Sequence, residues 1–77
     1  MEIKVLGPGC KKCQSLDKLV REATSELNIQ ANIEKVEDIP AIVQYGVMTT
    51  PGLVVDGKVK FSGRVPSKDK IKKILSE

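Results

Sequence analysis

Hydrophobic and polar positions change their spacing several times along the chain, and each change marks a predicted element. Residues 2–6 alternate loosely, with Ile3 and Val5 on one face, and are followed by the break Gly7-Pro8-Gly9. This pattern is typical of a short strand that ends in a loop. From residue 11 to about residue 28, apolar residues recur at three- and four-residue intervals, which predicts an amphipathic helix.

The predicted first helix has an apolar face and a charged face. Its apolar positions are Cys13, Leu16, Leu19, Val20, Ala23 and Leu27. Its charged positions are Lys12, Asp17, Lys18, Arg21, Glu22 and Glu26. We expect the first set to be buried and the second set, Asp17 included, to face solvent.

A second strand and a short second helix follow. Residues 31–36 contain recurring β-branched side chains and are predicted to form the strand. Because a helix separates this strand from the first one, the two strands are expected to be parallel. The short helix begins with Asp38 as its cap, contains Pro40 in its first turn and ends near Tyr45. The side chains expected to face inward are Ile39, Ile42 and Val43.

The last part of the chain predicts a hairpin and a third helix. Residues 53–55 and 59–61 flank Asp56-Gly57, a dipeptide that suits the positive φ angles of a type I′ turn. Ser67 can cap the final helix. Its core-facing positions are Ile71, Ile74 and Leu75. The predicted order is therefore strand, helix, strand, helix, strand, strand, helix.

Composition narrows the possible functions. The chain has 77 residues, of which 40% are hydrophobic, and this suits one domain, residues 1–77, with a modest core. Its net charge of +3 is spread out, and only Phe61 and Tyr45 are aromatic, so it has neither the basic stripe nor the stacking platform of a nucleic-acid-binding protein. No signal-peptide pattern and no long apolar run are present. We expect a monomeric cytoplasmic protein with no nucleic-acid or membrane partner.

The two cysteines, Cys10 and Cys13, lie where the predicted first strand gives way to the first helix. In a compartment that keeps thiols reduced, a closely spaced pair is more often catalytic or metal-binding than structural. Closing so small a ring stabilises a fold by roughly 1.9 kcal/mol, against about 3 for a 15-residue loop. We therefore interpret the pair as a site of thiol-disulfide chemistry, with metal binding as the alternative.

The charges around Cys10 favour its thiolate form. A helix N-terminus contributes about 0.3 to 1 kcal/mol, and Lys11 and Lys12 contribute roughly 0.2 to 1 kcal/mol each. Together these effects would lower the pKa of Cys10 from about 8.5 to roughly 6.5 to 7.5. The alternative is that both lysines only form a solvated helix end.

The element order and three motifs resemble the thioredoxin and glutaredoxin superfamily, and most of all its very small archaeal and bacterial members, called redox-active disulfide proteins. The motifs are Cys10-Lys11-Lys12-Cys13 after the first strand, Thr50-Pro51 before the hairpin and Gly63 just beyond it. The resemblance implies a thioredoxin-like α/β fold, β-α-β-α-β-β-α, with a four-stranded mixed sheet flanked by three helices. It also implies a cis peptide bond between Thr50 and Pro51.

The resemblance further implies a thiol-disulfide oxidoreductase that needs no cofactor. Cys10 would be the nucleophile and Cys13 the resolving thiol, while Thr50, Pro51 and Gly63 would contact the substrate. Its partners would be a disulfide-containing protein and a thioredoxin-reductase-like or other thiol electron donor. Two alternatives stay open: a metal-binding Cys-X-X-Cys protein, with a site shared in a dimer, and a non-catalytic redox-sensing module.

The chain also departs from the superfamily pattern at two places. Six residues before the first cysteine, where thioredoxins carry a buried acid, it has Lys4. Gly63 is followed by Arg64, where glutathione-binding glutaredoxins carry a second glycine and an acidic residue. This second departure argues against specificity for glutathione.

Overall fold

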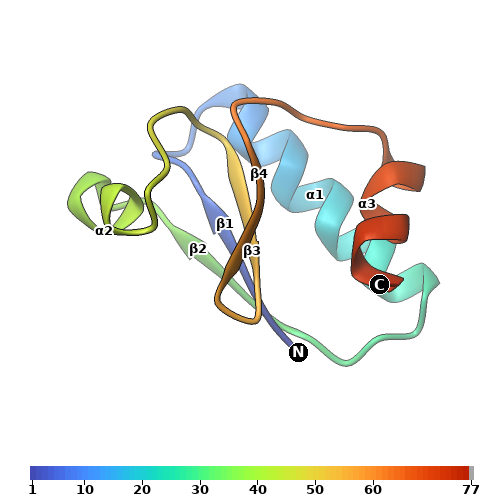
Figure 1. Ribbon diagram of the computed structural model, residues 1–77. Helices are drawn as coiled ribbons and strands as arrows, with labels where there is room; N and C mark the ends of the chain where they lie inside the picture. The colour runs from blue at the N-terminus through green and yellow to red at the C-terminus, as the bar shows by residue number, and fades with distance from the viewer. Residues whose placement is uncertain (77) are drawn as a thin grey trace.

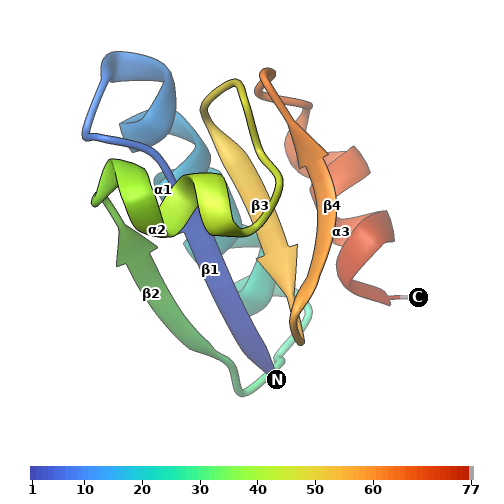
Figure 2. The same ribbon diagram turned by 60° about the vertical axis from the view of Figure 1, so that its left-hand side comes forward.

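The computed structural model describes residues 1–76 as a four-stranded sheet with helices on both faces. The elements are β1 (Glu2–Leu6), α1 (Lys11–Glu26), β2 (Asn32–Val36), α2 (Ile39–Gln44), β3 (Gly52–Val55), β4 (Lys58–Ser62) and α3 (Lys68–Ser76). Helices α1 and α3 cover one face of the sheet and α2 covers the other (Figure 1, Figure 2). The predicted α/β fold with its mixed sheet is confirmed.

The strand order β2-β1-β3-β4 places β1 and β3 in the centre of the sheet. β1 runs parallel to β2 and antiparallel to β3, as the crossover and the hairpin require. In the antiparallel register, Leu6 at the end of β1 faces Gly52 at the start of β3. The loop that follows β1 and the loop that precedes β3 therefore lie at the same end of the two central strands.

Two hydrophobic cores hold the layers together. The larger core lies between the sheet and helices α1 and α3, and its buried members are Ile3, Val5, Leu16, Val20, Ala23, Leu53, Val55, Phe61, Ile71 and Leu75. The smaller core lies under α2 and consists of Leu6, Ile42, Val47 and Val54. Successive residues of a strand point to opposite faces, which is why Val54 belongs to one core and its neighbours belong to the other.

The hairpin and the third helix follow the sequence prediction closely. Asp56 and Gly57 have φ angles of 50° and 83°, both in the left-handed region that a type I′ turn uses. Asp56 Oδ1 also accepts a hydrogen bond of 2.8 Å from the backbone N–H of Glu2. At the start of α3, Ser67 Oγ accepts from the N–H of Lys70 at 3.3 Å, so the predicted cap is confirmed.

The inward face predicted for α2 was wrong at two of three positions. Ile42 is 2% exposed, whereas Ile39 and Val43 are 53% and 52% exposed. A helix of six residues presents only a narrow face to a sheet, and Val47, in the loop after the helix, fills the adjacent part of the smaller core. Asp38 is the N-cap residue, but its side chain makes no capping hydrogen bond.

Asp17 was expected in solvent and is instead buried, with 13% of its side chain exposed. Its carboxylate accepts hydrogen bonds of 3.1 and 3.2 Å from Arg21 Nε. Lys35 of β2 also lies near it, with Nζ 3.8 Å from Asp17 Oδ2. Burial is tolerated because both neighbours are cations. The sequence pattern of α1 contained no sign that β2 would lie beside this flank.

Charged pairs join the exposed sides of α1 and α3. Glu26 forms ion pairs with Lys68 and with Lys72, the latter at 3.1 Å. These two lysines lower the pKa of Glu26, the hydrogen bond from Lys68 having the largest effect. Within residues 1–76, no helix has the length and hydropathy needed to cross a membrane.

The two isoleucines of α2 provide a matched test of this packing. Truncating Ile42 to Ala should lower the free energy of unfolding by about 2 to 5 kcal/mol, because it opens a cavity in the smaller core. Ile39→Ala should change it by no more than about 0.5 kcal/mol, since that side chain is largely exposed. Denaturant unfolding of both variants measures the difference, and equal losses would show that the assigned face of α2 is incorrect.

Candidate active site

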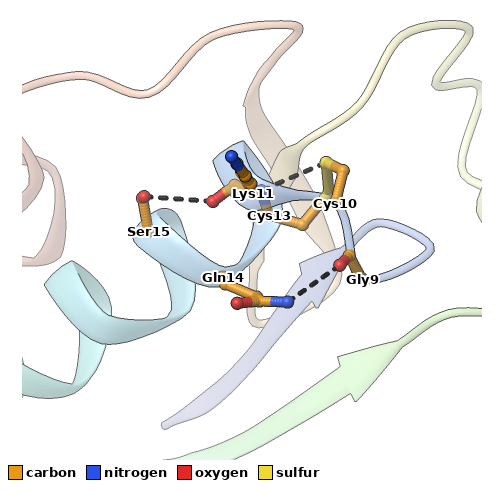
Figure 3. The surroundings of a disulfide bond; sticks show 6 residues. All are labelled: Gly9, Cys10, Lys11, Cys13, Gln14 and Ser15. Atoms are coloured by element: carbon orange, nitrogen blue, oxygen red, sulfur yellow. Dashed lines mark hydrogen bonds between the residues drawn. A yellow bond between two sulfur atoms is a disulfide. The ribbon is translucent and has the colours of Figure 1, made fainter.

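Cys10 and Cys13 form a disulfide at the N-terminal end of α1, with their Cα atoms 5.0 Å apart (Figure 3). Cys10 is the N-cap residue of the helix, and its sulfur accepts a hydrogen bond of 3.2 Å from the backbone N–H of Cys13. Cys10 is exposed, whereas Cys13 is only 4% exposed. The pair therefore has one sulfur at the surface and one against the core.

Local hydrogen bonds hold the first turn of α1 in place. Gly9 has a φ of +89°, a conformation that glycine adopts without steric cost, and it turns the chain into the helix. The side-chain amide of Gln14 reaches back and donates to the carbonyl oxygen of Gly9 at 3.0 Å (Figure 3). Ser15 Oγ donates to the carbonyl oxygen of Lys11 at the same distance. These contacts fix the orientation of both cysteines.

Gly7 is a site residue that sequence reasoning missed. A Cβ atom at this position would overlap the sulfur of Cys13 and lie 3.0 Å from its Cβ. The N–H of Gly7 donates to the carbonyl oxygen of Val36 at 2.9 Å, which holds the end of β1 against β2. The only available signal in the sequence was a glycine directly after a strand, and such a glycine more commonly serves a turn.

A small cavity lies beneath Cys13. Its volume is about 10 Å³, close to the smallest that admits one water molecule. Lys35 and Glu37 of the β2 segment line it together with Gly7 and Gln14. Neither charged residue was predicted to approach the cysteines, because Lys35 in β2 and Glu37 just after it are more than twenty positions away in the chain.

Lys4 points away from the cysteines. Its Nζ lies 6.0 Å from the centre of the Tyr45 ring, on the face of the sheet that α2 covers. Tyr45 raises the pKa of Lys4, chiefly by hydrogen bonding to the ammonium group. The position at which thioredoxins carry a buried acid is therefore occupied here by a cation outside the redox site.

The peptide bond between Thr50 and Pro51 is cis, the isomer that the resemblance implied. Pro51 is buried, and its Cα lies 3.9 Å from the Cβ that an alanine would have at Gly7. The carbonyl oxygen of Pro51 accepts a hydrogen bond of 2.8 Å from the N–H of Gly63. The predicted residues of the cis-proline loop and of the segment after β4 are thus brought together beside Cys13.

Gly63 is confined by its neighbours in the same way as Gly7. Its φ is +77°, and an added Cβ would lie 2.6 Å from Thr49 Oγ1. Beyond it, the chain borders a surface hollow of about 430 Å³ lined by Lys11, Lys12, Ser15, Gly63, Arg64 and Val65. Lys11, Lys12 and Gly63 were predicted site residues, whereas Arg64 was noted only as a departure from the glutaredoxin pattern.

Metal-ligating side chains do not gather at this site. No group of three or more His, Cys, Asp or Glu residues among residues 1–76 is placed to hold a metal ion. A tetrahedral zinc site uses four ligands. Among residues 1–76, the two cysteine sulfurs are not joined by a third His, Cys, Asp or Glu ligand.

A disulfide in the first turn of the helix that follows a central strand, packed beside a cis-proline loop, defines a thioredoxin-fold thiol-disulfide oxidoreductase. The family model described as "Thioredoxin domain" matches residues 1–76, and the chain belongs to this family. As an enzyme of this class, it reacts by thiol-disulfide exchange with disulfide substrates, and reductase-type electron donors in general return it to the dithiol form.

Two curated relatives are similar over nearly the whole chain. A thioredoxin of Methanothermobacter thermautotrophicus is 50% identical over 76 residues, which are 99% of this chain and 99% of the relative. A thioredoxin of Methanocaldococcus jannaschii is 40% identical over 73 residues, which are 95% of this chain and 84% of the relative. The similarity therefore includes both the redox site and the scaffold around it.

The close contact at Gly7 can be tested by adding a single methyl group. Gly7→Ala should destabilise the protein by about 1 to 3 kcal/mol, because the new Cβ forces Cys13 or the end of β1 to move. Gly52→Ala is the matched control, since its Cβ would meet neighbouring atoms only at 3.4 Å or beyond, and its effect should stay within about 1 kcal/mol. Denaturant unfolding of the oxidised proteins measures both. Equal stability of the two variants would contradict the assigned contact.

Proposed function

We propose that this protein reduces disulfides of partner proteins with Cys10 as the nucleophile and Cys13 as the resolving thiol. The Cys10 thiolate attacks one sulfur of the partner's disulfide, that bond breaks, and one partner thiolate leaves as a mixed disulfide forms. The Cys13 thiolate then attacks the Cys10 sulfur, which closes the Cys10–Cys13 disulfide and releases the second partner thiolate. Two electrons pass from the dithiol to the partner.

The observation that carries this assignment is the difference in exposure between the two cysteine residues. A partner disulfide can approach Cys10, which is exposed, whereas Cys13 is 4% exposed and reaches only its neighbour in the first turn. Cys10 also lies at the N-terminal end of α1, where the helix dipole favours a thiolate. Access and charge both support Cys10 as the attacking group.

We also propose that Thr50, Pro51 and Gly63 contact the partner. Thr50 is half-buried beside the redox site, and no hydrogen bond among residues 1–76 uses its backbone N–H or C=O. An extended segment of the partner can pair with these free groups, as a peptide pairs with a strand edge. Pro51 and Gly63 are joined by a hydrogen bond and would form the adjoining surface.

The physiological setting is part of the same proposal. Residues 1–77 would act as one thioredoxin-like domain, monomeric and cytoplasmic, and a thioredoxin-reductase-like enzyme or another thiol donor would restore the dithiol. Catalytic reduction of insulin with such a donor would support a turnover enzyme. Oxidation and reduction of the cysteine pair without turnover would instead favour the redox-sensing module.

Exchanging each cysteine for serine tests the two roles. Cys13→Ser should accumulate a stable mixed disulfide with an oxidised protein substrate, because the resolving thiol is missing. Cys10→Ser should form almost none, since the remaining sulfur is buried. Non-reducing electrophoresis and mass spectrometry measure both adducts. If the adduct formed through Cys13 in the Cys10→Ser protein, the assigned roles would be reversed.

The contribution of the two lysines can be measured on the reduced protein. Replacing Lys11 and Lys12 by Gln should raise the pKa of the Cys10 thiol by roughly 0.3 to 1.5, because two nearby positive charges are removed. Lys18→Gln is the control, since Lys18 is an exposed lysine further along the same helix. The pH dependence of alkylation of Cys10 gives the pKa. An unchanged value in the double variant would mean that the lysines are only a solvated helix end.

A further inference from the structure

The surface next to Cys10 in the chain carries a cluster of cations. It includes the hollow of about 430 Å³ bordered by Lys11, Lys12 and Arg64, which we call the cationic hollow. Its six lining residues include no carboxylate, and no ion pair within residues 1–76 neutralises any of the three cations. The positive charge at this place is therefore free to act on a bound partner.

Two carboxylates lie in the segment after β2, and one of them is close to the glycine that precedes Cys10. Glu37 Oε1 lies 4.0 Å from the Cβ that an added side chain would have at Gly9, directly before Cys10. Asp38 follows Glu37 in the chain, and both residues are exposed. The carboxylate of Glu37 shares its cavity with Lys35, whereas the lining of the cationic hollow holds cations only, so an acidic partner segment is favoured at the hollow.

Arg64 is positioned at the border of the hollow by one contact of its own and by the anchoring of the residue before it. Its guanidinium carbon lies 5.9 Å from the centre of the Phe61 ring, a distance at which a cation is attracted to the face of the ring. The preceding residue, Gly63, is tied to the cis-proline loop by its hydrogen bond to Pro51. A positioned arginine loses less conformational freedom when it binds a carboxylate.

We propose that the cationic hollow binds an acidic segment of the partner protein, adjacent in sequence to the cysteine that Cys10 attacks. This inference rests on the proposed function and adds a substrate preference to it. An extended partner segment paired with Thr50 passes beside Gly63, and its side chains then reach the hollow. The hollow is open to solvent. An open hollow suits the side chains of an extended partner segment better than a small ligand, because sites for small ligands enclose most of the ligand surface.

The test compares two synthetic peptide disulfides that differ only next to the target cysteine. One carries Asp-Glu beside the cysteine and the other carries Asn-Gln, so that length and shape are nearly equal. The dithiol form of the full chain should reduce the acidic peptide about fivefold faster at low salt. The ratio should approach one in about 0.5 M salt, because exposed charges are then screened.

Arg64→Glu should abolish or invert this ratio. The matched control is Lys58→Glu, which changes net charge equally at the hairpin turn, at the opposite end of the sheet from α1's first turn (Figure 1). It should keep the preference. Because each ratio compares two substrates on one variant, any change in stability or in the pKa of Cys10 cancels.

The outcomes separate this inference from the proposed function. If the wild-type protein reduces both peptides equally, the acidic segment is excluded while disulfide reduction stands. If it reduces neither peptide and not insulin, the proposed function itself fails. If it reduces oxidised glutathione with a dependence on Arg64 and shows no preference between the peptides, the hollow serves a small anionic disulfide, and the assignment to a protein segment is overturned.

Discussion

Cys13 is packed so tightly against the backbone at Gly7 that any side chain there would overlap its sulfur, and the rest of the site depends on this contact. The contact ties the first turn of α1 to the end of the central strand β1. The register between β1 and β3 then brings Pro51 to the same point from another part of the chain. Three segments distant in sequence thus meet around one buried sulfur.

That arrangement divides the chemistry between two otherwise identical thiols. Burial removes Cys13 from contact with partners, while the N-cap position keeps Cys10 exposed at the positive end of the helix dipole. A thiolate must be accessible to attack a partner, whereas the second thiol needs only to reach its neighbour. In the proposed mechanism, the scaffold therefore assigns the two roles through position alone, because the two residues are of the same type.

In our proposal, the charges around Cys10 add recognition of the partner to this reactivity. Lys11 and Lys12 follow Cys10 directly in the chain, so we propose that they act both on the thiol and on the bound partner. Arg64 comes from the segment after β4 and borders the same hollow, and in our proposal it acts mainly on the partner. Electrostatic complementarity of this kind changes orientation and association rate more than it changes final affinity. A small protein with few aromatic residues can select partners by this means.

The sequence alone determined the features that depend on neighbouring residues. The Cys10–Cys13 pair at a helix start and the Asp56-Gly57 turn follow from local spacing, and the element order predicted the parallel crossover and the antiparallel hairpin. Only the tertiary structure decided that Asp17 is buried beside Lys35, that Ile39 remains exposed, and that Gly7 contacts Cys13. Local periodicity reveals which residues share a face, but the segment that covers this face comes from elsewhere in the chain and leaves no local signal.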